Sequence, residues 1–134
     1  MELIADTSFL IGLWRRQEWA VEFAAERASA VIGIPWVVRG EFFHGARRAG
    51  HDLGEVERFL ELGIPVNDPT PVVAAYARLC AELQTGAPGV YRQVGQNDLW
   101  IAATAIDCGL PLVTRNLRHF GAMEGLRVQT LQGD

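Results

Sequence analysis

Short apolar runs alternate along this chain with longer segments of helical periodicity, and this alternation restricts the fold more than any other feature. Four runs, each too short for a helix, predict buried strands over residues 2–5, 30–34, 64–66 and 111–114. A fifth strand is expected over residues 127–131, at an edge of the sheet. Strands separated by helices pair in parallel through right-handed crossovers. The expected fold is therefore α/β, a three-layer α/β/α sandwich with a mostly parallel sheet of four to five strands.

The segments between these strands carry apolar residues at helical spacing. Helices are expected over residues 8–14, 17–28, 36–49 and 52–62, from Pro71 through Leu83, and from Asn97 or Asp98 to Cys108. Thr70 is the expected N-cap of the helix that Pro71 begins, and Gly50 and Gly109 are expected helix stops. Residues 86–96 are expected to lack regular structure.

The length and composition bound the class of protein. A chain of 134 residues fits one domain, residues 1–134. The net charge of −4 gives no general attraction to nucleic acid. All twelve basic residues are arginines, and the absence of lysine excludes P-loop and Schiff-base chemistry.

The same composition indicates a cytoplasmic protein. Cys80 and Cys108 lack metal-binding spacing and are interpreted as small buried hydrophobes in a reducing compartment. Glu2 and Asp6 interrupt the first apolar stretch, so a signal peptide is not expected. The longest apolar run, residues 30–38, is far shorter than the ~20 residues of a membrane span, and no membrane association is expected.

Four oxygen-bearing side chains stand at or near the ends of predicted elements, namely Asp6, Glu41, Asp98 and Asn116. Taken singly, Asp6 and Asp98 read as helix caps, Glu41 as half of a surface ion pair, and Asn116 as a loop residue. In open parallel sheets, however, ligands bind beyond the carboxyl ends of the strands, where Asp6 and Asn116 lie. We therefore expect a shared pocket that suits Mg²⁺ or Mn²⁺. Three carboxylates in one pocket also predict that at least one has a raised pKa.

Neighbouring residues refine this hypothesis. Glu41 interrupts an apolar segment, and the adjacent Gly40 and Gly45 predict close packing of the backbone there. Asp107 lies half a helical turn out of phase with Asp98, so we exclude it from the pocket. His119 is interpreted as a core anchor of its loop and not as a catalytic residue.

Substrate contacts are expected from a second group of residues. Ser8 is placed to hold a carboxylate or a metal-bound water. Arg48, Arg92 and Arg115 are the expected contacts to flanking phosphates. If the substrate is RNA, an unstacked base is expected to stack on Tyr91 or on an exposed tryptophan.

The sequence blocks that carry these residues resemble, in order, the PIN-domain ribonucleases, and most closely the VapC-type toxins of bacterial and archaeal toxin–antitoxin pairs. The matching stretches are Asp6-Thr7-Ser8-Phe9-Leu10-Ile11, Glu41-Phe42-Phe43-His44-Gly45, Asn97-Asp98-Leu99-Trp100-Ile101-Ala102-Ala103 and Val113-Thr114-Arg115-Asn116-Leu117-Arg118-His119-Phe120. The resemblance extends from Leu3 to Leu131. It implies Mg²⁺ or Mn²⁺, cleavage of single-stranded or looped RNA, a small cognate antitoxin and a homodimer.

By motif position, Asp6, Glu41 and Asp98 look like the metal-site carboxylates of this family. Asn116 stands where many relatives have aspartate, and its amide adds no charge for a second metal. Hydrolysis of a phosphodiester needs an activated water and stabilisation of negative charge, and a carboxylate-held Mg²⁺ supplies both. Asp6 and Asp98 are the expected ligands, directly or through water. Glu41 is expected to hold a metal-bound water or to assist its deprotonation.

Three alternatives compete with this hypothesis. A phosphatase with Asp6 as nucleophile would place its second aspartate at Ser8 and would need a lysine. A signalling receiver domain would need a lysine and a paired acidic start, and this chain has neither. A PIN-like RNA- or protein-binding module without cleavage activity is the third alternative, and a metal-dependent cleavage assay separates it from the nuclease.

Overall fold

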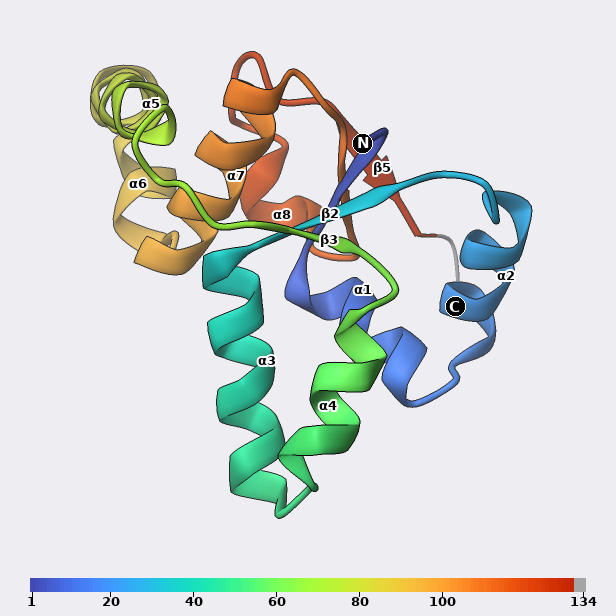
Figure 1. Cartoon of the computed structure of the whole chain (residues 1–134). Coiled ribbons are helices and arrows are strands. Elements are labelled where there is room, and N and C mark those ends of the chain that lie inside the picture. Colours follow the sequence, from blue (N-terminus) through green and yellow to red (C-terminus); the bar gives the residue numbers. More distant parts are fainter. Residues whose placement is uncertain (132–134) are drawn as a thin grey trace.

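One sheet of five parallel strands, in the order β3-β2-β1-β4-β5, forms the centre of the protein (Figure 1). The computed structural model describes residues 1–131, apart from the side chain of Thr130. The strands are β1 (Leu3–Ala5), β2 (Ile32–Pro35), β3 (Ile64–Val66), β4 (Leu112–Thr114) and β5 (Val128–Thr130). Strands β1, β2 and β4 are buried along their whole length, which explains their uninterrupted apolar runs.

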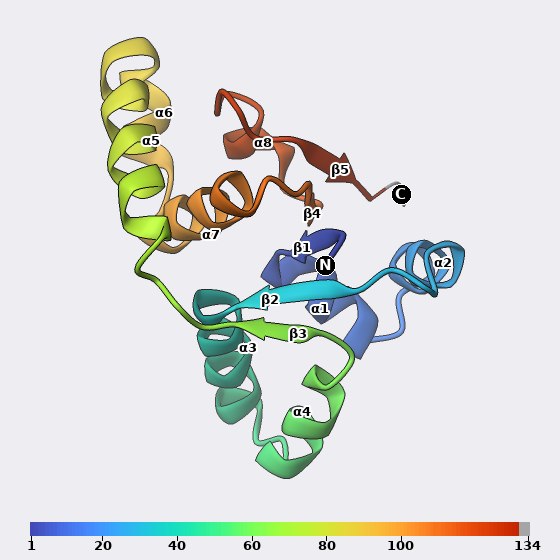
Figure 2. The ribbon, with the colours of Figure 1, turned by 45° about the horizontal axis from the view of Figure 1, so that its top comes forward.

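Helices cover both faces of the sheet and complete a three-layer α/β/α sandwich. They are α1 (Thr7–Trp14), α2 (Glu18–Glu26), α3 (Trp36–Ala49), α4 (Leu53–Leu60), α5 (Val72–Gly86), α6 (Pro88–Gln93), α7 (Gln96–Cys108) and α8 (Leu117–Phe120). Figure 2 shows α3 and α4 on one side of strands β2 and β3, and α5, α6 and α7 on the other side. The predicted fold class and the edge position of the fifth strand are confirmed.

The strand order reverses at β1, which lies between β2 and β4. The carboxyl ends of β1 and β4 lie side by side, because Ala5 pairs with Val113 and the Asp6 N–H donates to the Val113 carbonyl at 3.0 Å. A reversal of this kind leaves a crevice outside the strand ends, and this is where ligands bind in such sheets. The fold thus brings the residues after β1 next to the residues at the end of β4.

Helix α7 is buried from Leu99 through Ala105, except for the half-buried Trp100, and carries Asp98 in its first turn. Its residues Ile101, Ala102, Ala103 and Ala105 have no exposed surface, so small side chains pack it closely against its neighbours. Helices α3 and α7 end at glycines in the left-handed conformation, as predicted, with φ of 78° at Gly50 and 66° at Gly109.

Several predicted boundaries are wrong. The stretch 86–96 contains helix α6, which begins at Pro88, the residue type that favours a first helical position. The short helix α8 was not predicted. Thr70 does not cap α5, because its N–H bonds to the Asp68 side chain at 3.0 Å and Pro71 takes the N-cap position. Helix α7 begins at Gln96, so Asp98 lies in its first turn and is not the cap.

No helix of the described chain is both long and apolar enough to cross a membrane.

Candidate metal and active site

Asp6 is a buried carboxylate whose orientation is fixed by three hydrogen bonds. Its side chain is 5% exposed. Its Oδ2 accepts from Thr114 Oγ1 at 2.6 Å and from Ser8 Oγ at 3.1 Å, and its Oδ1 accepts from the Thr7 N–H at 2.8 Å. Burial raises the pKa of Asp6, whereas these bonds favour the charged form and oppose the rise. Asp6 is also the N-cap of α1, so its capping role and its place at the strand end coincide.

Glu41 lies on α3 and is tied to both elements that carry the aspartates. Its Oε1 accepts from Thr7 Oγ1 at 2.5 Å, and its Oε2 accepts from Asn97 Nδ2 at 3.2 Å. Thr7 follows Asp6 and Asn97 precedes Asp98 in the chain, so the two bonds hold Glu41 at the same location as the aspartates. This arrangement differs from the solvated ion pair that was the alternative for Glu41.

Asp98 is half-buried in the first turn of α7, and its pKa is raised to about 6. Burial is the largest cause, followed by the negative charges of Asp6 and Glu41, while His119 opposes the rise. The prediction of a raised carboxylate pKa is confirmed, although repulsion contributes less than burial. Because the three carboxylates act on one another electrostatically, we call the region that they share the carboxylate pocket.

Asn116 is connected to the carboxylate pocket by a hydrogen bond of its backbone. It occupies the N-cap position of α8, and its N–H donates to Thr114 Oγ1 at 2.9 Å. In residues 1–131 no hydrogen bond links its side-chain amide to Asp6, Glu41 or Asp98. The structure therefore brings Asp6, Glu41 and Asp98 together and places Asn116 beside them.

Asp6 and Asp98 are the carboxylates of the pocket that could hold a divalent cation. Among the described residues, no three acidic, histidine or cysteine side chains are grouped closely enough to hold a metal ion by themselves. Mg²⁺, however, commonly keeps several waters and is bound by one or two carboxylates together with substrate phosphates. Asp6 and Asp98 both resist ionisation in the metal-free protein, and a bound cation would relieve this by favouring their charged forms.

The predicted substrate contacts are not equally close to this pocket. Ser8 lies within it, because its Oγ bonds Asp6 and also accepts the backbone N–H of Arg115 at 3.2 Å. The Arg115 guanidinium lies over the Trp19 ring, 4.3 Å from its centroid. Arg48 and Arg92 are exposed in the last turns of α3 and α6, and neither lines a cavity that reaches Glu41.

Two cavities adjoin Glu41 on α3. The larger, about 330 Å³, lies between α1 and α3 and is mainly apolar; we call it the α1–α3 groove. Its walls include Ile11, Trp14, Phe42, Gly45 and Ala46, with Arg15 and Glu41 as charged members. The smaller, about 240 Å³, is lined by Trp36, Val37, Gly40, Glu41, His44 and Asn97; we call it the Trp36 cavity.

The glycines beside Glu41 do not pack closely against other segments, and that expectation is wrong. A Cβ added at Gly40 or Gly45 would meet no atom within 4 Å. A glycine in a helix interior costs about 1 kcal/mol relative to alanine. Both glycines instead leave open space in the two cavities, and Arg15, which the sequence did not single out, lines the larger one.

Sequence reasoning also missed that Thr7, Asn97 and Thr114 position the carboxylates through hydrogen bonds. Thr114 could have been found as a hydroxyl that ends a buried strand, because its side chain has to bond within the crevice. His119 lies near enough to Asp98 to affect its pKa. Its buried Nδ1 has no hydrogen-bond partner in the described chain. The neighbouring Phe120 is buried and anchors the loop as expected, whereas His119 is half-buried.

Asp98→Asn is expected to raise the melting temperature of the metal-free protein at neutral pH. The folded-state pKa of about 6 exceeds the ordinary 3.8. The folded state therefore binds the proton more tightly, and the associated stability is complete below pH 4 and lost as pH rises through 6. Allowing for solvent screening at a half-buried group, the gain is about 1 kcal/mol or ~4 °C at pH 7.5.

The measurement is thermal melting from pH 4.5 to 7.5 in EDTA, with Asp107→Asn as an exposed control on the same helix. Wild type should also gain more than Asp98→Asn on adding Mn²⁺, where ~100 times the dissociation constant adds roughly 2.7 kcal/mol. A clear drop in the metal-free melting temperature of Asp98→Asn would show instead that Asp98 mainly stabilises the start of α7.

The chain is similar to several known proteins. The sequence model of the PIN domain matches residues 3–125. "Ribonuclease VapC2" of Haemophilus influenzae is 26% identical over 133 residues, which cover 96% of this chain and 97% of that protein. "Ribonuclease VapC1" of Rickettsia felis is 28% identical over 138 residues, with 98% and 97% covered. The structure of DNA-bound VapBC from Salmonella typhimurium matches with a TM-score of 0.83 and 26% identity, over 98% of this chain and 99% of that one.

Proposed function

Because the chain belongs to the PIN-domain family, we propose that it is a metal-dependent endoribonuclease and the toxin of a type II toxin–antitoxin system. The observation that carries the proposal is the convergence of Asp6, Glu41 and Asp98 at the point where the strand order reverses. The names of its relatives support RNA as the substrate. The proposal takes residues 1–134 as one nuclease domain that acts in the cytoplasm.

Asp6 and Asp98 would hold Mg²⁺ or Mn²⁺, which when bound acts as a Lewis acid toward the phosphate and activates water. Burial and three hydrogen bonds restrict Asp6 to one orientation. Glu41, which Thr7 and Asn97 hold, would bind the water that attacks phosphorus or accept its proton. The P–O bond to the leaving ribose oxygen then breaks, and that oxygen takes a proton from solvent.

Arg115 and Ser8 extend the site toward the RNA backbone. Stacking on Trp19 limits the freedom of the Arg115 side chain, and its backbone is bonded to Ser8. A preordered guanidinium binds phosphate with less loss of entropy than a mobile one. Arg48 and Arg92 would contact phosphates further along the strand, because both lie away from the cavities at Glu41.

A small antitoxin is the proposed protein partner. The α1–α3 groove offers a mainly apolar surface that includes Glu41. An antitoxin helix would cover this groove and place an arginine near Asp6 and Glu41, where its charge would neutralise the carboxylate pocket. The VapBC complexes among similar structures support such a pairing, and a homodimer remains expected from the family resemblance.

Expression of the chain alone is expected to arrest bacterial growth, and co-expression of the small neighbouring gene is expected to restore it. Gly45→Phe should remain toxic but escape this rescue, because Gly45 lines the α1–α3 groove, an added Cβ there meets no atom within 4 Å, and the ring would occupy space that the antitoxin helix needs. Gly86→Phe is the matched control, since Gly86 also faces open space but lies outside the groove. Viable counts after induction measure both effects. Harmless overexpression of the wild-type chain would contradict the toxin assignment.

A further inference from the structure

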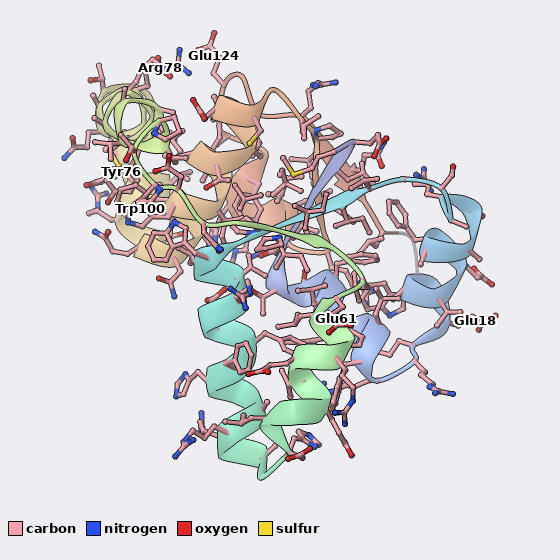
Figure 3. All side chains as sticks on the ribbon, viewed as in Figure 1. Glu18, Glu61, Tyr76, Arg78, Trp100 and Glu124 are labelled. Atoms are coloured by element: carbon pink, nitrogen blue, oxygen red, sulfur yellow. The ribbon has the colours of Figure 1, made fainter. Side chains whose placement is uncertain are left out.

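Three aromatic side chains from three helices form a column beside the carboxylate pocket. Tyr76 of α5 stacks on Trp100 of α7, with ring centroids 3.8 Å apart and planes at 9°. The Trp100 ring lies 6.2 Å from that of Trp36, the first residue of α3, and their planes are tilted by 54°, so these two rings touch without stacking. Tyr76 Oη donates to Gln96 Oε1 at 2.7 Å. Figure 3 shows Tyr76 and Trp100 between α5 and the N-terminal end of α3. These contacts hold the inner two rings, and Trp36 is the outer end of the column.

Trp36 is the most exposed of the four tryptophans. Its side chain is 39% exposed, whereas Trp14, Trp19 and Trp100 are half-buried. An indole ring that contacts a neighbouring ring and keeps more than a third of its surface exposed can provide a stacking surface at little cost in entropy. The Trp36 ring also lines the Trp36 cavity, which Glu41 joins to the carboxylate pocket. A group bound in the cavity would therefore lie next to the reacting phosphate.

Gly40 keeps the floor of this cavity open. It lies four residues after Trp36 and so occupies the same face of α3. A Cβ at this position would meet nothing within 4 Å, so packing does not require glycine here. Alanine would favour the helix but would project into the cavity. The chain thus retains a destabilising residue where a flat ligand would approach the backbone.

The chemistry of the lining favours a neutral, planar ligand with N–H donors. Among the described residues that line the cavity, Glu41 is the only acidic side chain and there is no arginine, so a phosphate would be disfavoured. Glu41 and Asn97 contribute acceptor oxygens at one wall, and Trp36 contributes an aromatic face. The volume of about 240 Å³ far exceeds the roughly 30 Å³ of one water molecule. Nucleobases are planar rings that stack on aromatic side chains and carry amino donors on their edges.

We propose that the base next to the scissile phosphate stacks on Trp36 inside the Trp36 cavity, so that this cavity positions the RNA and influences which sequence is cut. The inference rests on the proposed nuclease function. It assigns the expected base-stacking role to Trp36 and not to Tyr91, which does not line this cavity. Gly40 and Trp36 are positioning residues, since they contact the base and not the reacting atoms.

The test is binding of a fluorescein-labelled, random-sequence 12-nucleotide RNA to the full chain in EDTA, followed by anisotropy. Trp36→Leu is expected to weaken binding about 10-fold, and Trp36→Phe to weaken it less. Gly40→Ala is expected to weaken binding while its melting temperature stays equal or rises, which separates a ligand effect from misfolding. Val31→Ala, an exposed apolar residue just before β2 and at the other end of the strands, should leave binding unchanged.

An abasic 12-nucleotide strand identifies what Trp36 contacts. Wild type should bind it about as weakly as Trp36→Leu binds the normal RNA, and Trp36→Leu should not discriminate between the two strands. Normal RNA binding and cleavage by both Trp36→Leu and Gly40→Ala would overturn this inference and leave the nuclease assignment standing. The inference would also be overturned if Trp36→Leu changed the molar mass measured by ultracentrifugation but left RNA affinity unchanged. Trp36 would then join two copies of the chain and would not contact RNA. If wild type did not cleave RNA, the proposed ribonuclease function itself would be contradicted.

Discussion

Asp6→Asn is expected to lower the rate of RNA cleavage by at least ~100-fold while the protein folds normally. Loss of a residue that only orients a metal ligand typically costs 10–100-fold, and Asp6 is a proposed ligand itself. The fold should tolerate the change because the asparagine oxygen can still accept the Thr7 N–H. The hydroxyls of Ser8 and Thr114 can turn to accept from its amide.

Initial cleavage rates in excess Mg²⁺ measure this effect, with circular dichroism and melting to verify the fold. Asp98→Asn should lose most of the activity as well, whereas Asp107→Asn should retain it, since Asp107 is exposed on the same helix. Thr114→Val should give an intermediate loss, because it removes the 2.6 Å bond that orients Asp6. Wild-type turnover in both Asp6→Asn and Asp98→Asn would show that the carboxylate pocket is not the catalytic site.

Removal of divalent metal is the second change with a large expected effect. EDTA should abolish cleavage, and Mg²⁺ or Mn²⁺ should restore it in a saturable manner. Without a cation, Asp6, Glu41 and Asp98 present negative charge to an anionic substrate. A bound cation would reverse the sign of this interaction and stabilise the charge that develops during hydrolysis.

The control for chelation is RNA binding in the same buffers, measured with the labelled 12-nucleotide RNA. Binding should weaken in EDTA but persist, because backbone contacts such as those proposed for Arg115 do not depend on the metal. Cleavage that continues at the full rate in EDTA would show that the mechanism does not need a metal, but it would leave the assignment as a ribonuclease standing.

The architecture was predictable from sequence because buried parallel strands require uninterrupted apolar runs. Strands β1 and β4 could be predicted from such runs, and the ends of these strands determine where Asp6 and Asn116 lie. The position of Glu41 was visible because a carboxylate stands out in an apolar segment of α3. Short helices such as α8 were missed, since four residues carry almost no periodic signal.

The side-chain network around the carboxylates could not be predicted in the same way. The bonds from Thr114 to Asp6 and from Asn97 to Glu41 join positions 108 and 56 residues apart, and they depend on how α3 and α7 pack. The prediction of close packing at Gly40 and Gly45 was wrong for a related reason. A glycine is found both where segments pack closely and where space is open, and only the surrounding residues show which case applies. Burial is the main cause of the raised Asp98 pKa, and the burial of a side chain cannot be predicted from sequence spacing.

The most direct test of the central claim is end mapping of total cellular RNA after incubation with the purified chain. Wild type with Mg²⁺ should produce new RNA ends at a small number of discrete sites, and these should be missing in EDTA and with Asp6→Asn. RNA that is bound but never cut by wild type in Mg²⁺ or Mn²⁺ would contradict the account and favour a PIN-like binding module. The same products from wild type and Asp6→Asn would contradict it as well, because the cleavage would not come from the carboxylate pocket.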